Sequence, residues 1–124
     1  MQTLVIGYGN TLRGDDGVGY VAAEQIAEWR LPNLVAIACH QLTPELAASI
    51  AECDRVIFID ATLPGVQTQV QLQSLQPQAG TSFDAHRSDP TDLLQLTAQL
   101  YGRSPQAYHV LLPTADMDFS ETLS

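Results

Sequence analysis

A short apolar run that leads straight into a glycine-rich loop constrains the fold of this chain more than any other feature. The run TLVI covers residues 3–6, and the loop GYGNTLRGDDGVG covers residues 7–19. A continuous apolar run that stops at glycine is typical of a central strand in a parallel sheet, where both faces are buried. Residues 15–30 then carry apolar side chains at helical spacing and reach a stop at Pro32. We therefore expect a strand, a loop and a helix that open an α/β fold. The apolar stripe of the helix is expected to consist of Val18, Val21, Ala22, Ile26 and Trp29.

Strands and helices alternate along the rest of the chain. Strands are expected at residues 34–38, 55–61, 68–75 and 107–112, and helices at 43–53 and 88–102. The segment 68–75 alternates polar and apolar residues, which is typical of an edge strand with one face in water and is compatible with an antiparallel direction. This order predicts one α/β domain over residues 1–124, with helices on both faces of a sheet. A further helix is expected after the fifth strand, and the sequence stops before one begins.

The second and third helices have recognisable ends. Thr43 is expected as the N-cap of the second helix, with Pro44 at its first position. The third helix is expected to begin near Ser88 or Asp89 and to end at Gly102. The shared apolar face of the second helix is predicted to hold Leu42, Leu46, Ile50 and Cys53. The buried face of the third is predicted to hold Leu93, Leu96, Leu100 and Tyr101.

The composition disfavours several classes of function. Hydrophobic residues make up 45% and charged residues 15%, which is typical of a folded domain. The chain has 14 acidic residues against 5 arginines and a net charge of −9, so binding to nucleic acid or to a membrane surface is disfavoured. No apolar stretch approaches the roughly 20 residues of a membrane span, and the N-terminus lacks signal-peptide features, so we expect a cytoplasmic protein.

Cys39 and Cys53 lack metal-binding spacing and are expected to be small buried residues.

The glycine-rich loop does not match a phosphate site. A dinucleotide fingerprint needs a third glycine where this loop has Leu12, and a P-loop needs a lysine where Asp15 follows Gly14. The carboxylates of Asp15 and Asp16 would also repel a phosphate at the helix N-terminus. Two interpretations remain open. The carboxylates cap the helix and complement its dipole, or one of them turns inward and binds a cation.

Topology brings two more polar residues toward these carboxylates. Ligands of open α/β sheets bind at the carboxyl ends of the strands. Asp16 follows the first strand, Asp60 ends the third, and His86 lies in the loop before the third helix, within reach of the same edge. Two carboxylates and one imidazole suit a divalent metal such as Ni, Zn, Mn or Fe. A loop cap at Asp60 and an exposed loop residue at His86 remain alternatives. His40 and His109 are weaker candidates, and His109 is expected to be a core or sheet-face histidine.

Several segments together resemble the hydrogenase maturation proteases. They are VIGYGNTLRGDDGVG, QLTPELA, VIFIDA and the segment of His86 before LLQLT, and they follow the family's order along the whole chain. Members of this family are endopeptidases that remove the C-terminal extension from the large-subunit precursor of [NiFe] hydrogenases. The segments HQLTPELA and LYG are most similar to the cyanobacterial type for the bidirectional hydrogenase. The resemblance implies a three-layer α/β/α sandwich around a five-stranded mixed sheet whose fourth strand is antiparallel.

The resemblance also implies a ligand set and a partner. Asp16, Asp60 and His86 match the family's metal-site residues, and the metal is nickel that the precursor already carries and that serves as the recognition element. The same three residues are the catalytic candidates, because the motif does not identify the group that activates the attacking water. The implied partner is the precursor, no organic cofactor is implied, and a monomer is expected. The loop residues expected to meet the substrate are Gly7, Gly9, Asn10, Arg13 and Asp15.

One departure from the family leaves a second function open. Members usually continue with another helix after the segment that corresponds to residues 121–124, so this chain is expected to be truncated and to expose apolar sheet surface. A non-catalytic metal-binding α/β module is therefore the alternative to an endopeptidase. A nucleotide-binding domain ranks last, because the glycine or lysine that it needs is missing.

Overall fold

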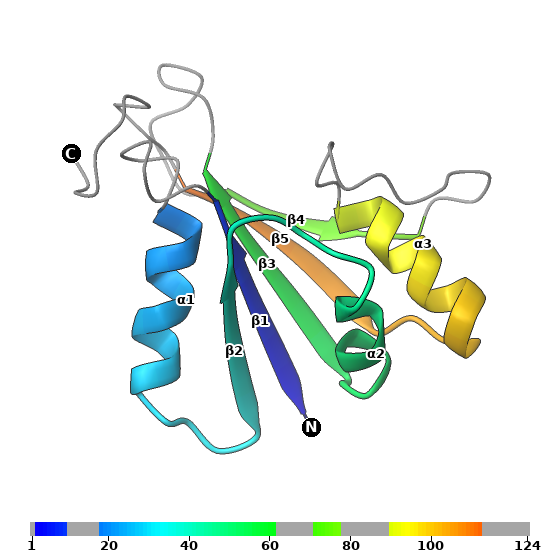
Figure 1. Ribbon diagram of the computed structural model, residues 1–124, viewed down its shortest axis with the longest axis horizontal. Helices are drawn as coiled ribbons and strands as arrows, with labels where there is room; N and C mark the ends of the chain where they lie inside the picture. Colours follow the sequence, from blue (N-terminus) through cyan, green and yellow to red (C-terminus); the bar gives the residue numbers. More distant parts are fainter. Residues whose placement is uncertain (1, 10–17, 62–70, 78–89, 113–124) are drawn as a thin grey trace.

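The computed structural model describes residues 2–9, 18–61, 71–77 and 90–112, which form strands and helices in the order that the sequence predicts. Figure 1 shows a central sheet with helices packed against it. None of the described helices is long and apolar enough to cross a membrane. In chain order, the elements are β1 (Thr3–Tyr8), α1 (Val18–Glu28), β2 (Leu34–Cys39), α2 (Leu46–Ala51), β3 (Arg55–Ala61), β4 (Gln71–Leu75), α3 (Pro90–Tyr101) and β5 (Gln106–Leu112).

The strands form one five-stranded mixed sheet in the order β2-β1-β3-β5-β4. The pairs β1–β2, β1–β3 and β3–β5 are parallel, and β4 pairs with β5 in the antiparallel direction at the edge of the sheet. The predicted α/β fold, with its antiparallel fourth strand, is confirmed. Because β1, β3 and β5 run in one direction, their carboxyl ends meet at one edge, which is the upper edge in Figure 1.

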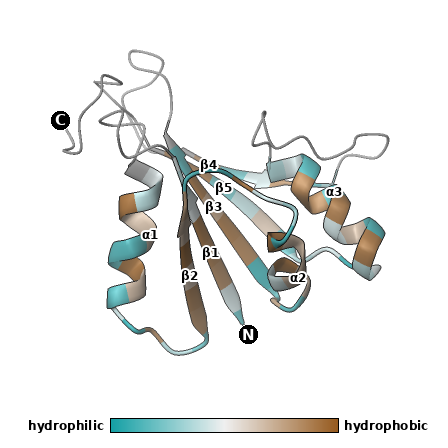
Figure 2. Cartoon of the chain, viewed as in Figure 1, coloured by the Kyte–Doolittle hydropathy of each residue, from teal (hydrophilic) through white to brown (hydrophobic). Residues whose placement is uncertain are grey.

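The register of the strands assigns alternate residues to opposite faces of the sheet. Leu4 pairs with Val56, and Val56 pairs with Ala107, so these side chains share one face. The main core packs side chains of α2 and α3 against this face. Figure 2 shows the apolar residues running along the central strands. The large, fully buried residues of this core are Ile6, Leu42, Ile50, Val56, Phe58, Leu93 and Leu94.

The other face of the sheet is covered by α1, which contacts β2, β1 and β3. Two glycines permit this close approach. A Cβ atom on Gly7 in β1 would lie 2.6 Å from the Cβ of Ala23, and one on Gly19 in α1 would lie 2.6 Å from the carbonyl oxygen of Tyr8. The Cβ on Gly19 would be nearer still to the carbonyl oxygen of Ile59. Glycine at both positions therefore sets the distance between α1 and the sheet.

The α1 face also carries an open groove over β3, β5 and β4. The groove has a volume of about 520 Å³, and its most exposed side chain is Leu72, which is 67% exposed. Most of the side chains that line it are apolar. The lining residues are Arg55, Ile57, Leu72, Tyr108 and Val110.

The end of α1 differs from the prediction. Trp29 was expected to close the apolar stripe, but the helix ends at Glu28 and Trp29 is 61% exposed. Arg30 follows with a positive φ of 50° in the turn, so the chain has left the helical path before Pro32. A turn at residues 29 and 30 therefore comes between the helix and Pro32. Because Trp29 lies in this turn, it is not part of the apolar stripe of α1.

The buried face of α3 is rotated relative to the predicted one. Leu93 is buried and Leu96 packs against the core as expected, but Leu100 and Tyr101 are 61% and 50% exposed. The face toward the core instead includes Leu94 and Thr97. Thr97 donates its hydroxyl hydrogen bond to the carbonyl oxygen of Leu93 at 2.9 Å, so its polar group is satisfied inside the core. The prediction missed Thr97 because threonine is not apolar, and this reason does not apply to Leu94.

Backbone hydrogen bonds define the end of α3 and the turn before α2. The predicted stop at Gly102 is confirmed: its φ is +73°, and its amide donates to the carbonyl of Ala98 at 2.9 Å. Helix α2 begins later than predicted: its N-cap is Glu45 and not Thr43. The Thr43 carbonyl accepts from the amide of Leu46 at 3.2 Å, which forms a tight turn before the helix. The four residues predicted to share an apolar face, Leu42, Leu46, Ile50 and Cys53, all pack in or against the core, although Leu42 and Cys53 flank α2 instead of lying in it.

Both cysteines are free. Cys53 is 2% exposed, and its thiol donates to the carbonyl oxygen of Ile50 at 3.1 Å. Cys39 is half-buried at the end of β2. Burial raises the pKa of both thiols above the usual value for cysteine. The prediction of small buried residues is confirmed for Cys53 and holds in part for Cys39.

Candidate functional site

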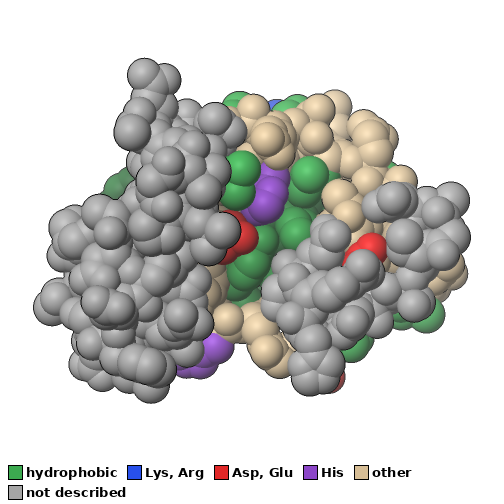
Figure 3. Space-filling view, turned by 90° about the horizontal axis from the view of Figure 1, so that it is seen from above, with side chains coloured by type: hydrophobic (Ala, Val, Ile, Leu, Met, Phe, Trp, Pro, Cys, Tyr) green, Lys and Arg blue, Asp and Glu red, His purple; other side chains and the backbone are tan. Residues whose placement is uncertain are grey.

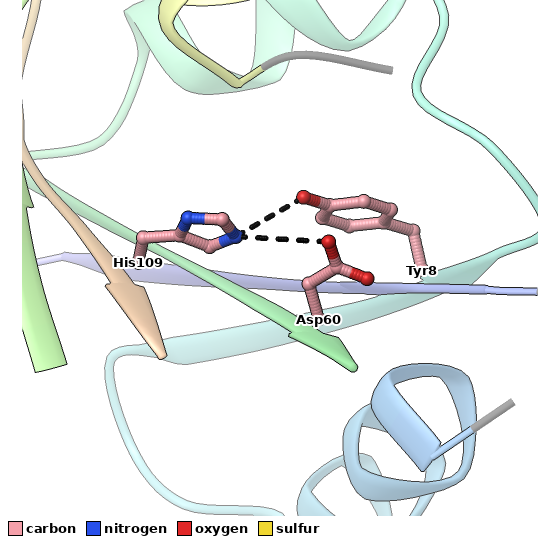
Figure 4. A network of polar contacts seen from close by, with 3 residues as sticks. All are labelled: Tyr8, Asp60 and His109. Atoms are coloured by element: carbon pink, nitrogen blue, oxygen red, sulfur yellow. Dashed lines mark hydrogen bonds and ion pairs between the residues drawn. The ribbon is translucent and has the colours of Figure 1, made fainter. Parts of the chain in front are cut away.

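Three polar side chains from three neighbouring strands meet near the carboxyl edge of the sheet. They are Tyr8 of β1, Asp60 of β3 and His109 of β5, as Figure 4 shows. Phe58 pairs with His109 across β3 and β5, and Asp60 lies two residues beyond Phe58 on the same strand. Side chains two residues apart share a face, so Asp60 and His109 point to the same side of the sheet.

The imidazole of His109 faces both of the other side chains with one nitrogen, as Figure 4 shows. Its Nε2 atom is 3.2 Å from the Tyr8 hydroxyl and 3.9 Å from Oδ2 of Asp60. The rings of Tyr8 and His109 are stacked, with an angle of 12° between their planes and 6.4 Å between their centroids. The first distance is a hydrogen bond, whereas the second is longer than a hydrogen bond and is an ion pair only when His109 is protonated. One nitrogen therefore faces both a phenol and a carboxylate.

Exposure increases from Tyr8 to Asp60. Tyr8 is 4% exposed and belongs to the core, while the side chains of His109 and Asp60 are 14% and 29% exposed. Figure 3 looks onto this edge of the sheet and shows an acidic and a histidine side chain next to each other, among hydrophobic side chains. The buried phenol anchors the group, and the carboxylate is the member that a ligand reaches most easily.

The arrangement supports two kinds of chemistry. An unprotonated Nε2 accepts a hydrogen bond from the Tyr8 hydroxyl, and a protonated Nε2 donates toward the oxygens of Tyr8 and Asp60. A carboxylate beside an imidazole can hold a divalent metal or transfer a proton. Within the described part of the chain, no group of three His, Cys, Asp or Glu side chains is close enough to hold a metal ion. Of the three predicted ligands Asp16, Asp60 and His86, the described residues include Asp60 alone.

The other predicted ligands, Asp16 and His86, lie outside the described residues. The same holds for the predicted substrate-loop residues Asn10, Arg13 and Asp15.

Gly7 and Gly9 are described. Gly7 packs against α1 as set out above. Gly9 has a φ of 152°, and its amide donates to the carbonyl of Cys39 at 3.2 Å. This bond ties the start of the loop to the end of β2.

Sequence reasoning missed Tyr8 and gave His109 a minor place. The prediction of a sheet-face histidine is confirmed for His109, but its contacts with Tyr8 and Asp60 were not foreseen. Tyr8 and His109 are separated by 101 positions, so only the strand register brings them together. A weak signal was present, because both interrupt apolar strands, Tyr8 at the carboxyl end of β1 and His109 in the middle of β5. His40 is exposed and stacks on Tyr20, with 5.0 Å between the ring centroids.

Solved structures resemble this chain over nearly its whole length. The [NiFe] hydrogenase maturation protease HybD from Thermococcus kodakarensis superposes with a TM-score of 0.76 at 24% identity, over 100% of this chain and 87% of that one. The hydrogenase maturating endopeptidase HybD from E. coli gives a TM-score of 0.75 at 19% identity, over 100% of this chain and 81% of that one. The protease HycI from Thermococcus kodakarensis KOD1 gives 0.72 at 19% identity, over 98% and 80%.

The chain has the fold of these maturation proteases. At this level of identity the likeness concerns the arrangement of strands and helices. No protein-family model matches the sequence, and no curated protein matches it. These structures give no support to the cyanobacterial subtype that the resemblance suggested.

Proposed function

We propose that this protein is an endopeptidase that removes the C-terminal extension from the large-subunit precursor of a [NiFe] hydrogenase. The observation that carries the proposal is the position of Asp60, a partly exposed carboxylate near the carboxyl end of β3 and beside an imidazole. Ligands of α/β sheets bind at this edge. Two further facts support it: the fold is that of proteins described as [NiFe] hydrogenase maturation proteases, and the sequence motifs resemble the same family.

We further propose that nickel in the precursor is the recognition element and that Asp16, Asp60 and His86 bind it. Nickel is here part of the substrate. Carboxylate oxygens and imidazole nitrogens are suitable ligands for it. A precursor without nickel offers these side chains nothing to coordinate, so it binds more weakly and is cut more slowly. The same three residues are the candidates for activating the attacking water, and no organic cofactor is required.

The test is cleavage of purified precursor, with and without nickel, followed by mass spectrometry. Asp60→Asn keeps the size of the side chain and removes its charge, and we expect it to reduce nickel-dependent cleavage by about 100-fold. The matched control is Asp54→Asn. Asp54 immediately precedes β3, at the end of the strand opposite Asp60, and its Oδ2 accepts a hydrogen bond from the amide of Gln2 at 2.8 Å. Asparagine retains an acceptor oxygen there, so we expect near-normal cleavage.

The possible results separate the candidate functions. Cleavage that does not depend on nickel would contradict the recognition role but not the peptidase. Nickel binding without cleavage of any precursor would favour the non-catalytic metal-binding module. The cyanobacterial subtype, the cytoplasmic location and the monomeric state stay predictions.

A further inference from the structure

We infer that His109, held in place by Tyr8, is a positioning residue for the Asp60 carboxylate. This inference rests on the proposed function, because it assigns Asp60 to the substrate-binding edge. The resemblance assigned no role to His109 or to Tyr8. The geometry in Figure 4 gives each of them one: Tyr8 orients the imidazole, and the imidazole orients the carboxylate.

The contact with His109 bears on how the Asp60 carboxylate is oriented. Its terminal torsion has a broad energy profile, so the backbone alone does not determine which way the two oxygens point. Oδ2 faces Nε2 of His109 at 3.9 Å, and Figure 4 shows the second oxygen pointing away from the imidazole. The contact with His109 thus engages one oxygen and directs the other away from the imidazole, as second partners of metal-binding carboxylates do.

His109 is itself firmly held. Its Nε2 is 3.2 Å from the Tyr8 hydroxyl, and the two rings lie within 12° of parallel. Tyr8 is 4% exposed, so its ring is fixed by the core beneath it. Both residues lie on strands joined through β3, which makes their separation a property of the sheet. Groups on rigid strands hold a partner more accurately than groups on loops.

The test measures binding of Ni²⁺ alone to the full chain by calorimetry at constant pH. We expect His109→Leu to weaken binding about tenfold and Tyr8→Phe to weaken it less, because Tyr8 acts one step further away. His109→Gln retains a hydrogen-bonding group and should restore part of the loss. His40→Gln is the control, since His40 is an exposed histidine that stacks on Tyr20. Circular dichroism checks that each variant folds. If His109→Leu does not fold, Tyr8→Phe still tests the inference, because it removes only the hydroxyl oxygen.

A double variant separates positioning from direct ligation. If His109 acts through Asp60, His109→Leu changes nothing further in an Asp60→Ala background. A second, additive loss in that background would overturn the inference, because His109 would then contact the metal itself. Unchanged affinity in folded His109→Leu and Tyr8→Phe, with loss in Asp60→Ala, would also overturn it while leaving the proposed function intact. Unchanged affinity in Asp60→Ala would instead reject Asp60 as a nickel ligand, and with it this inference.

Discussion

The two faces of β3 differ in how deeply their apolar side chains are buried. Val56 and Phe58 are completely buried against the side of α2 and α3. Ile57, between them, lines the open groove on the other face. All three residues are apolar, and the sequence pattern treats them alike. The comparison teaches that the helices above a sheet, more than hydropathy along a strand, decide which apolar residues stabilise the fold.

The largest difference is expected between Phe58→Ala and Ile57→Ala. Removal of a fully buried aromatic ring leaves a cavity, so Phe58→Ala should lower the free energy of unfolding by about 3 to 5 kcal/mol. Ile57→Ala removes a side chain at the groove and should cost about 1 kcal/mol. Urea unfolding followed by circular dichroism measures both. Equal losses would show that the groove is as well packed in solution as the core.

A smaller effect is expected where α1 meets the sheet. Gly19→Ala places a Cβ within 2.6 Å of the Tyr8 carbonyl oxygen, and backbone atoms cannot move aside easily. We expect a loss of about 1 to 3 kcal/mol. Ala27→Val is the matched control, because it adds bulk to the exposed side of the same helix, and its cost should stay within about 0.7 kcal/mol. A stable Gly19→Ala variant would mean that α1 moves readily on the sheet.

The smallest effect is expected at the edge strand. Leu72 is 67% exposed at the groove, so Leu72→Ser should change the free energy of unfolding by less than about 0.5 kcal/mol. Leu75 on the same strand packs against the core, and Leu75→Ser should cost about 1 to 2 kcal/mol. The pair shares strand and residue type, so thermal unfolding compares the two faces directly. A large loss at Leu72 would indicate that the groove is covered.

Much of the fold follows from local patterns. Short apolar runs, the alternation in β4 and the glycine stop at Gly102 identify strands and helices within a few residues. The location of Asp60 is also predictable, because it ends an apolar run and strand ends of an α/β sheet meet at one edge. The errors at Trp29 and Leu100 arise at helix ends, where hydropathy no longer reports which side faces the core.

The sequence by itself determined the order of the elements and the carboxylate at the end of β3, and the family resemblance implied the mixed sheet. Only the tertiary structure decided that Tyr8 and His109 meet beside this carboxylate and that Ile57 faces a groove while Phe58 lies in the core. Periodicity is a local property, set by the backbone geometry of a few residues. Contacts between strands depend on register and on the helices above them, which join residues about a hundred positions apart.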